Sequence, residues 1–168
     1  MLKKLMQSRP RLRLAVAESL TGGNVQARVT AESGASTYFV GGVTAYTIDQ
    51  KVALLGVKRK AAEACDCVSA EIARQMAHGV CRLMGANISV ATTGYAEPDP
   101  AKGMHAPKAH WAVCHLVTEI KGKGAKRRRA KPVFIDGYGE FPGADRDTVQ
   151  ARVSDEAIAA LVKYFGSV

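Results

Sequence analysis

The sequence contains no apolar run near the roughly 20 residues needed to cross a bilayer, so neither a membrane-spanning helix nor a membrane partner is expected. The hydrophobic stretch within residues 1–10 is too short for a secretory signal, and the expected location is the cytosol. There are only four cysteines, which are expected to be thiols in that compartment. Wholesale disorder is excluded, since 47% of the residues are hydrophobic and 23% are charged.

Acidic residues are absent from the segment that begins at Lys121 and ends at Lys131 (KGKGAKRRRAK), which holds seven basic residues. The whole chain has a formal charge of +9, and without this segment the charge is 9 − 7 = +2. The segment lies between strand-like residues 109–120 and 132–141, so a hairpin tip is expected. A basic loop can bind nucleic-acid phosphates, but no aromatic residue is present in it to stack on bases. A solvated loop is the main expectation and a nucleic-acid contact the alternative.

The length of 168 residues suits a single domain spanning 1–168, because no repeat or Pro/Ser-rich linker divides it. Strands are expected over 12–17, 39–47 and 88–92, a turn over 19–23, and helices over 24–30, 49–55, 70–84 and 146–165. Strands alternate with helices early in the chain and a hairpin follows late. This order predicts an α/β fold, a three-layer sandwich with a mixed β-sheet flanked by helices.

The helix boundaries are marked by capping residues. Ser69 is a good N-cap and Gly85 a good end for the helix over 70–84, while Asp49 and Gly56 are expected to bound the shorter one. Apolar stripes are expected on two helices. Their members are Ile72, Met76, Val80, Leu83 and Met84 in the first, and Val149, Val153, Ala157, Leu161 and Phe165 in the second.

Residues 17–23 (AESLTGG) form the first segment suited to chemistry. A strand that ends in hydroxyl residues and glycines before a helix presents backbone N–H groups at a positive helix terminus. That arrangement suits a phosphate, a carboxylate or an oxyanion. The alternative is that Ser19 or Thr21 caps the helix, while Gly22 and Gly23 allow a tight turn.

The second segment, residues 41–46 (GGVTAY), is followed five residues later by Lys51. Tyr46 and Lys51 can face one cleft from a strand end and a first helical turn. A serine hydroxyl needs a base to remove its proton, and a desolvated lysine of lowered pKa can do this. The alternative is an ordinary surface lysine.

The third segment, residues 92–98 (TTGYAEP), follows a strand at the edge where open α/β sheets gather ligands. Its alternative is an ordinary strand exit. A metal site is not expected, because Cys65 and Cys67 are separated by one residue rather than the roughly two to four typical of zinc sites.

Together these segments resemble the CinA C-terminal family, the nicotinamide mononucleotide deamidases of the PncC type. The family's AES-x-TGG motif stands at 17–23, its GAS-x-YF-x-GGV-x-AY segment at 34–46 and its K-x-x-LLGV segment at 51–57. A V-S-x-E-x-A helix start stands at 68–73 and a TG-x-A-x-P loop at 93–98. The resemblance is close as far as this loop and looser beyond it.

This resemblance implies hydrolysis of the carboxamide of nicotinamide mononucleotide to the acid and ammonia, without a metal or other cofactor. It implies that Ser19 is the nucleophile and Lys51 its base, with Tyr46 as a supporting hydroxyl. It further implies that the oxyanion and substrate are held by residues from several segments, namely Thr21, Gly22, Gly23, Ser36, Thr44, Thr93, Gly94 and Arg146. A homodimer or larger homo-oligomer is implied as well.

Two positions depart from the family pattern. Glu97 stands where the family loop has a glycine, and it adds negative charge near the place expected for an anionic phosphate. Gln150 stands where a second arginine is usual, which removes a bidentate phosphate anchor. The alternatives are therefore a relative with a different amide substrate, or a non-catalytic nucleotide-binding or interaction domain.

Overall fold

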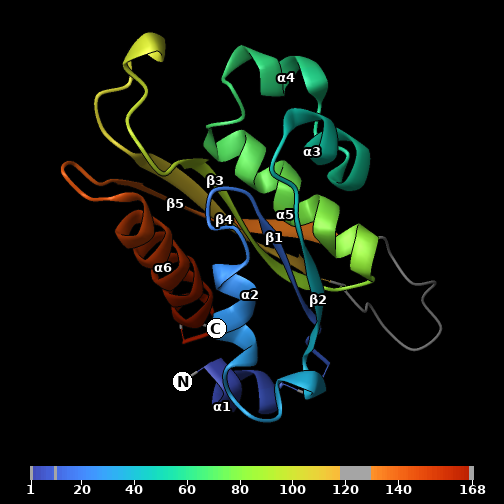
Figure 1. Cartoon of the computed structure of the whole chain (residues 1–168). Helices are drawn as coiled ribbons and strands as arrows, with labels where there is room; N and C mark the ends of the chain where they lie inside the picture. Colours follow the sequence, from blue (N-terminus) through green and yellow to red (C-terminus); the bar gives the residue numbers. More distant parts are fainter. Residues whose placement is uncertain (1, 10, 118–129, 167–168) are drawn as a thin grey trace.

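The computed structural model describes residues 2–9, 11–117 and 130–166 (Figure 1). Its helices and strands, in chain order, are α1 (Leu2–Gln7), β1 (Leu14–Glu18), α2 (Asn24–Thr30), β2 (Phe39–Thr44), α3 (Ile48–Leu55), α4 (Arg59–Ala64), α5 (Ala70–Met84), β3 (Ile88–Tyr95), β4 (Lys108–Val117), β5 (Lys131–Glu140) and α6 (Arg146–Gly166). Short 3₁₀ helices, η1 (Ala35–Thr37) and η2 (Pro100–Lys102), precede β2 and β4.

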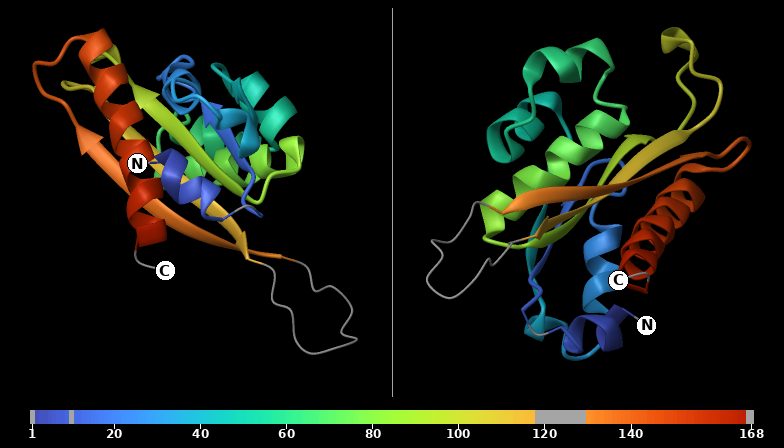
Figure 2. Two further views of the ribbon diagram at one scale, coloured as in Figure 1. Left: turned by 90° about the horizontal axis from the view of Figure 1, so that it is seen from below. Right: turned by 180° about the vertical axis from the view of Figure 1, so that it is seen from behind.

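The strands form one mixed sheet in the order β2-β1-β3-β4-β5. β1 is parallel to both β2 and β3, whereas β4 is antiparallel to both β3 and β5. Helices cover the two faces (Figure 2): α1 and α2 lie with α6 on one face, and α3 and α4 lie with α5 on the other. The expected three-layer α/β fold is confirmed.

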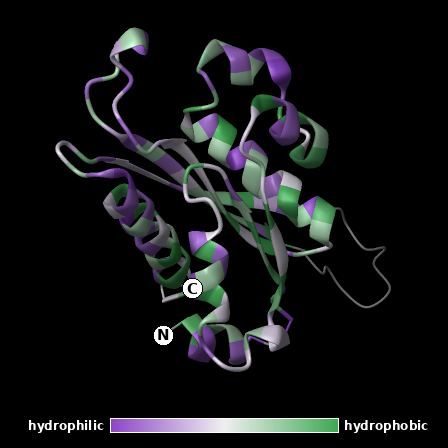
Figure 3. Ribbon diagram, in the orientation of Figure 1, coloured by the Kyte–Doolittle hydropathy of each residue, from purple (hydrophilic) through white to green (hydrophobic). Residues whose placement is uncertain are grey.

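Each face of the sheet has its own hydrophobic core, because side chains alternate between the faces along a strand. In β1, Leu14 and Val16 belong to the core beneath α6, while Ala15 and Ala17 belong to the core beneath α5. Figure 3 shows hydrophobic residues along the central strands and mixed colours along α5 and α6, as amphipathic helices require.

The caps of α5 are confirmed. Ser69 Oγ accepts a hydrogen bond from Ile72 N at 3.2 Å, and Gly85 ends the helix with a positive φ of 62°. Every expected apolar residue of α6 is buried, as are the first three of the α5 stripe. Leu83 is an exception, since its side chain is exposed, whereas Met84 beside it is partly buried against the core.

Several boundaries were predicted wrongly. The N-cap of α3 is Thr47, not Asp49: its side chain accepts from Gln50 N at 3.3 Å, so the helix begins one residue earlier. β2 ends at Thr44, before the chain turns into that cap, and β3 continues through Tyr95 because β4 pairs with its whole length. The short helices α1 and α4 carry no strong sequence periodicity and were not expected.

Parallel strands bring their carboxyl ends to one edge of a sheet, which is where α/β folds bind ligands. β1, β2 and β3 all end at this edge, and β5, two antiparallel steps from β3, also ends there and leads into α6. β4 runs the other way and ends at the opposite edge of the sheet, where its last residue, Val117, pairs with Lys131 at the start of β5. Most of the basic segment, residues 121–129, lies outside the described residues.

No helix in the described part of the chain is long and apolar enough to span a bilayer. Cys65, Cys67, Cys81 and Cys114 are all free thiols. Within the described ranges, no group of three or more His, Cys, Asp or Glu side chains is arranged to hold a metal ion.

Candidate active site

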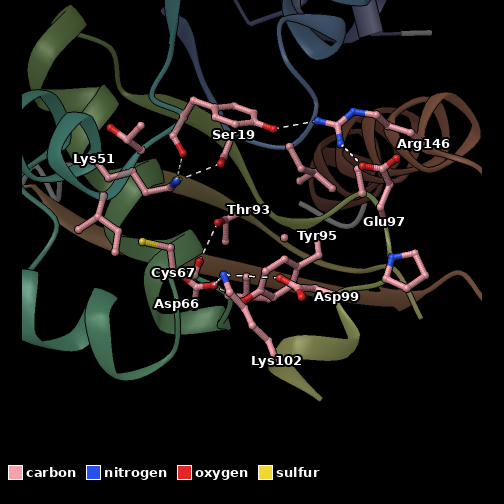
Figure 4. Close-up of a pocket in the computed structure, with 18 residues that line it drawn as sticks. Ser19, Lys51, Asp66, Cys67, Thr93, Tyr95, Glu97, Asp99, Lys102 and Arg146 are labelled. Carbon is pink, nitrogen blue, oxygen red and sulfur yellow. Dashed lines mark hydrogen bonds and ion pairs between the residues drawn. The ribbon is translucent and has the colours of Figure 1, made fainter. Parts of the chain in front are cut away.

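A pocket of about 450 Å³ opens at the edge of the sheet where the parallel strands end (Figure 4). Its walls come from the turn after β1, the start of α3, the turn before α5, the end of β3 and its loop, and the first residue of α6. The predicted site residues that line it are Ser19, Tyr46, Lys51, Thr93, Gly94 and Arg146.

Ser19 and Lys51 meet inside this pocket. Lys51 Nζ donates to Ser19 Oγ at 3.0 Å and to the backbone carbonyl of Tyr46 at 2.9 Å. Ser19 is 6% exposed and Lys51 only 3%. Burial lowers the pKa of Lys51 below that of an exposed lysine, and the neighbouring Cys67 and Asp66 only partly oppose this. The lowered pKa makes the neutral amine easier to form, and only the neutral amine can accept a proton from the serine.

The turn that presents Ser19 is held by the buried carboxylate of Glu18. Its Oε2 accepts from Thr21 Oγ1, Gly23 N and Val25 N, and its Oε1 accepts from Gln26 N, all within 2.6–3.1 Å. These donors include the first N–H groups of α2, where a negative charge is favoured by the helix dipole. Glu18 is therefore the residue that fixes the start of α2 next to the nucleophile.

Lys51 is positioned by the close packing of α3 on α5. A Cβ placed on Gly79, in the middle of α5, would lie 2.0 Å from the carbonyl oxygen of Leu55 at the end of α3. Only glycine allows this approach. The spacing of the two helices, and with it the place of Lys51, depends on the absence of a side chain at this position.

Arg146 and Glu97 form an ion pair at the side of the pocket (Figure 4). Arg146 Nη1 donates to Glu97 Oε2 at 2.7 Å, and Nη2 donates to Tyr46 Oη at 2.8 Å. Both bonds raise the pKa of Arg146, so it stays charged. The hydroxyl of Tyr46 thus contacts Arg146, whereas its backbone carbonyl contacts Lys51.

The sequence of this chain is similar to those of known proteins. A scan against models of protein families matches residues 1–120 to the CinA C-terminal domain. The chain belongs to this family. The first part of the sequence, with its three motifs, lies within the matched region.

Two curated relatives of this CinA-family chain illustrate the extent of the similarity. A CinA-like protein of Chlorobium limicola is 48% identical over 92 residues, which are 55% of this chain and 21% of the relative. A putative competence-damage inducible protein of Symbiobacterium thermophilum is 35% identical over 153 residues, 90% of this chain and 34% of the relative. The chain therefore spans about a fifth to a third of the curated relatives it matches.

Solved structures give the same relationship at the level of the fold. A CinA superfamily protein of Klebsiella pneumoniae superposes with a TM-score of 0.82 at 26% sequence identity, covering 99% of this chain and 94% of that one. A competence/damage inducible protein of Agrobacterium tumefaciens superposes with a TM-score of 0.73 at 25% identity, covering 96% and 91%. The whole CinA domain is thus similar, including the part after residue 120.

Some residues that the CinA resemblance implied lie away from the pocket. Thr21, Gly22 and Gly23 do not line it: Gly23 N is bonded to Glu18 and Gly22 N to the Ser19 carbonyl. Ser36 and Thr44 do not line it either. Ser36 lies in η1 before β2, at the opposite edge of the sheet, and Thr44 is exposed on the edge strand β2.

Gln150, at the family's second arginine position, contacts the nucleophile turn. Its Nε2 donates to the Leu20 carbonyl at 2.7 Å, and its Oε1 accepts from Asn24 Nδ2 at 3.5 Å. Leu20 itself lines the pocket. In this chain α6 therefore restrains the turn after Ser19 through a neutral amide.

A second group of pocket residues includes the predicted Thr93, but its other members were missed by the sequence analysis. Asp66 accepts from both Tyr95 Oη and Lys102 Nζ, and these bonds hold the pKa of Asp66 below its usual range. Thr93 Oγ1 donates to the Cys67 carbonyl at 2.7 Å. Asp66 and Cys67 have positive φ angles of 47° and 62°, which is uncommon for non-glycine residues. Nothing in the sequence Cys65-Asp66-Cys67 indicates that Asp66 contacts Tyr95 and Lys102.

Proposed function

We propose that this chain is a serine-type amidohydrolase that hydrolyses the carboxamide of a nicotinamide nucleotide or nucleoside to the acid and ammonia, with nicotinamide mononucleotide as the substrate that the family resemblance implies. The observation that carries the proposal is the buried 3.0 Å contact between Lys51 Nζ and Ser19 Oγ in an open pocket. Membership of the CinA family is consistent with this chemistry.

In the first half of the proposed reaction, neutral Lys51 takes the hydroxyl proton as Ser19 Oγ attacks the amide carbon. The tetrahedral intermediate collapses when the Lys51 ammonium gives that proton to the leaving nitrogen, so ammonia departs and an ester forms on Ser19. In the second half, Lys51 removes a proton from water as the water oxygen attacks the ester carbon. The ester bond then breaks, the Lys51 ammonium returns the proton to Ser19 Oγ, and the acid leaves.

The oxyanion of each tetrahedral intermediate needs hydrogen-bond donors. Because Gly23 N is engaged with Glu18, we assign this role to the backbone N–H of Leu20, the residue that follows the nucleophile and lines the pocket. The bond from Gln150 to the Leu20 carbonyl restrains the same loop. Burial of Lys51 supplies the lowered pKa that a base needs.

Ammonia release tests the proposal. The pure chain is incubated with nicotinamide mononucleotide and with its dephosphorylated riboside, and ammonia is measured against a Ser19→Ala variant of equal stability. Release that disappears in Ser19→Ala supports an amidohydrolase. Saturable binding of intact ligand, with no ammonia from either amide, would instead indicate a non-catalytic nucleotide-binding domain.

A further inference from the structure

The charges that line the pocket do not favour an anionic substrate. Apart from the buried Lys51, the described lining carries two cationic side chains, Lys102 and Arg146, and three carboxylates. These carboxylates belong to Asp66, Glu97 and Asp99. With Lys51 in the neutral form that acts as a base, acidic groups outnumber cations at the pocket.

Both cations are already paired. Arg146 contacts Glu97 through one terminal nitrogen and Tyr46 Oη through the other. Lys102 contacts Asp66 and lies 3.8 Å from Asp99. A phosphate that entered the pocket would have to displace Glu97 from Arg146 and would then lie beside that carboxylate, which repels it.

The helix N-termini at the pocket have some of their N–H groups bonded within the chain. α3 and α6 begin beside it with Thr47 accepting from Gln50 N and Asp145 accepting from Thr148 N. Since free N–H groups at a helix N-terminus are a common phosphate site, each cap leaves one donor fewer for a phosphate.

From these contacts we infer that the pocket selects an amide whose ring is cationic and which carries no phosphate, and that Glu97 determines this selection. The inference rests on the proposed amidohydrolase function and names its substrate class. A pyridinium nucleoside amide such as nicotinamide riboside carries the positive ring without the phosphate. Its positive charge is favoured because carboxylates outnumber cations in the lining by one when Lys51 is neutral, whereas the phosphate of the mononucleotide is opposed by Glu97.

The kinetic test compares kcat/KM for ammonia release from nicotinamide riboside and from nicotinamide mononucleotide. The unaltered chain is expected to prefer the riboside. Glu97→Gln frees Arg146 from its carboxylate partner and is expected to shift the ratio toward the mononucleotide by roughly two- to fivefold, the effect of one partly exposed charge contact. The preference of the unaltered chain should also shrink as salt is added, since exposed charges are screened.

Glu63→Gln is the matched control. Glu63 pairs with Arg59 on the surface helix α4 and does not line the pocket, so its removal changes the charge of the protein equally without altering the ratio. Substitution of both Glu97 and Arg146 by glutamine should cancel most of the shift in the kcat/KM ratio that Glu97→Gln alone produces, because the cation that would contact the phosphate is then absent.

Binding to Ser19→Ala, with and without Glu97→Gln, separates selection from catalysis. Calorimetric titration with the two nicotinamide compounds should give tighter binding of the riboside, and Glu97→Gln should narrow the difference. If ammonia is released but the mononucleotide is preferred, or Glu97→Gln leaves the ratio unchanged, the inference is overturned and the proposed function stands. If no ammonia is released yet the binding preference is found, the proposed function fails and the selection stands. Binding of neither compound overturns both.

Discussion

Ser19 Oγ and Lys51 Nζ lie within 3.0 Å although 32 residues separate them in the sequence. The contact forms because Ser19 follows the inner strand β1, while Lys51 lies in the first turn of the helix that follows the neighbouring edge strand β2. A buried lysine amine costs free energy unless it is neutral or well bonded. Here the buried amine contacts a serine hydroxyl inside a pocket, and the proposed chemistry depends on this contact.

The first prediction concerns the two reacting side chains. Ser19→Ala and Lys51→Met should each lower kcat by at least roughly a thousandfold, because each removes a group that acts in the same step. Steady-state ammonia release measures this. The double variant should be little worse than either single one; independent, multiplying effects would contradict joint action.

Lys51→Met should lose activity without losing stability. The apolar side chain of similar length removes the cost of burying an amine, and this gain offsets the hydrogen bonds lost at the Tyr46 carbonyl and Ser19 Oγ. The free energy of unfolding is therefore expected to change by less than about 1 kcal/mol. Urea unfolding followed by circular dichroism measures this. A loss of several kcal/mol would mean that Lys51 serves mainly to hold the fold.

The second prediction concerns pH. Because burial lowers the pKa of Lys51 from the ordinary 10.5, the neutral base forms at lower pH than an exposed lysine would allow. Activity should therefore rise with pH and level off before 10.5. Between the two pKa values the unfolded chain keeps the proton that the folded chain has lost, so the free energy of unfolding should also rise with pH there. Lys51→Met should lack this rise in stability; its persistence would assign the titration to another group.

The third prediction concerns Glu18, whose carboxylate accepts hydrogen bonds from the nucleophile turn and the start of α2. Glu18→Gln replaces one oxygen by an NH₂ group and leaves at least one buried N–H donor without its acceptor. The free energy of unfolding should fall by about 1–3 kcal/mol. Because Ser19 follows directly, kcat should fall more than KM changes. Glu63→Gln, an exposed counterpart, should do neither, and equal effects from the two variants would refute the role of Glu18.

The fourth prediction concerns Gly79. Gly79→Ala puts a methyl group against the backbone of Leu55, where no flexible side chain can yield. The free energy of unfolding should fall by about 1–3 kcal/mol or more, and kcat should fall because α3 carries Lys51. Gly166→Ala, at the end of α6 where a Cβ meets nothing within 4 Å, is the control. An active, fully stable Gly79→Ala would show that this helix spacing does not position the lysine.

The sequence predicted the elements whose signals are local. Ser69 and Gly85 mark the ends of α5 through capping and a left-handed turn, and the four-residue spacing in α6 reports its buried face. The contact between Ser19 and Lys51 is different, because it depends on strand order. It was predicted through family resemblance rather than from spacing.

Other parts of the site were hidden for physical reasons. The turn after Ser19 was expected to offer free N–H groups to an oxyanion, but Glu18, the residue before it, accepts several of them. Ser36 was expected in the pocket, yet it precedes β2 and so lies at the other edge of the sheet. Asp66 meets Tyr95 and Lys102 only because two loops converge there, and no spacing along the chain reports such a meeting.

The most direct measurement is the mass of the protein during turnover. The chain is mixed with nicotinamide riboside or nicotinamide mononucleotide, quenched in acid within the first turnover, and examined intact and after digestion. The account predicts a mass increase equal to the acyl group, located on Ser19 and absent from Ser19→Ala. Ammonia release that continues in Ser19→Ala, or an acyl group carried by another residue, would contradict it.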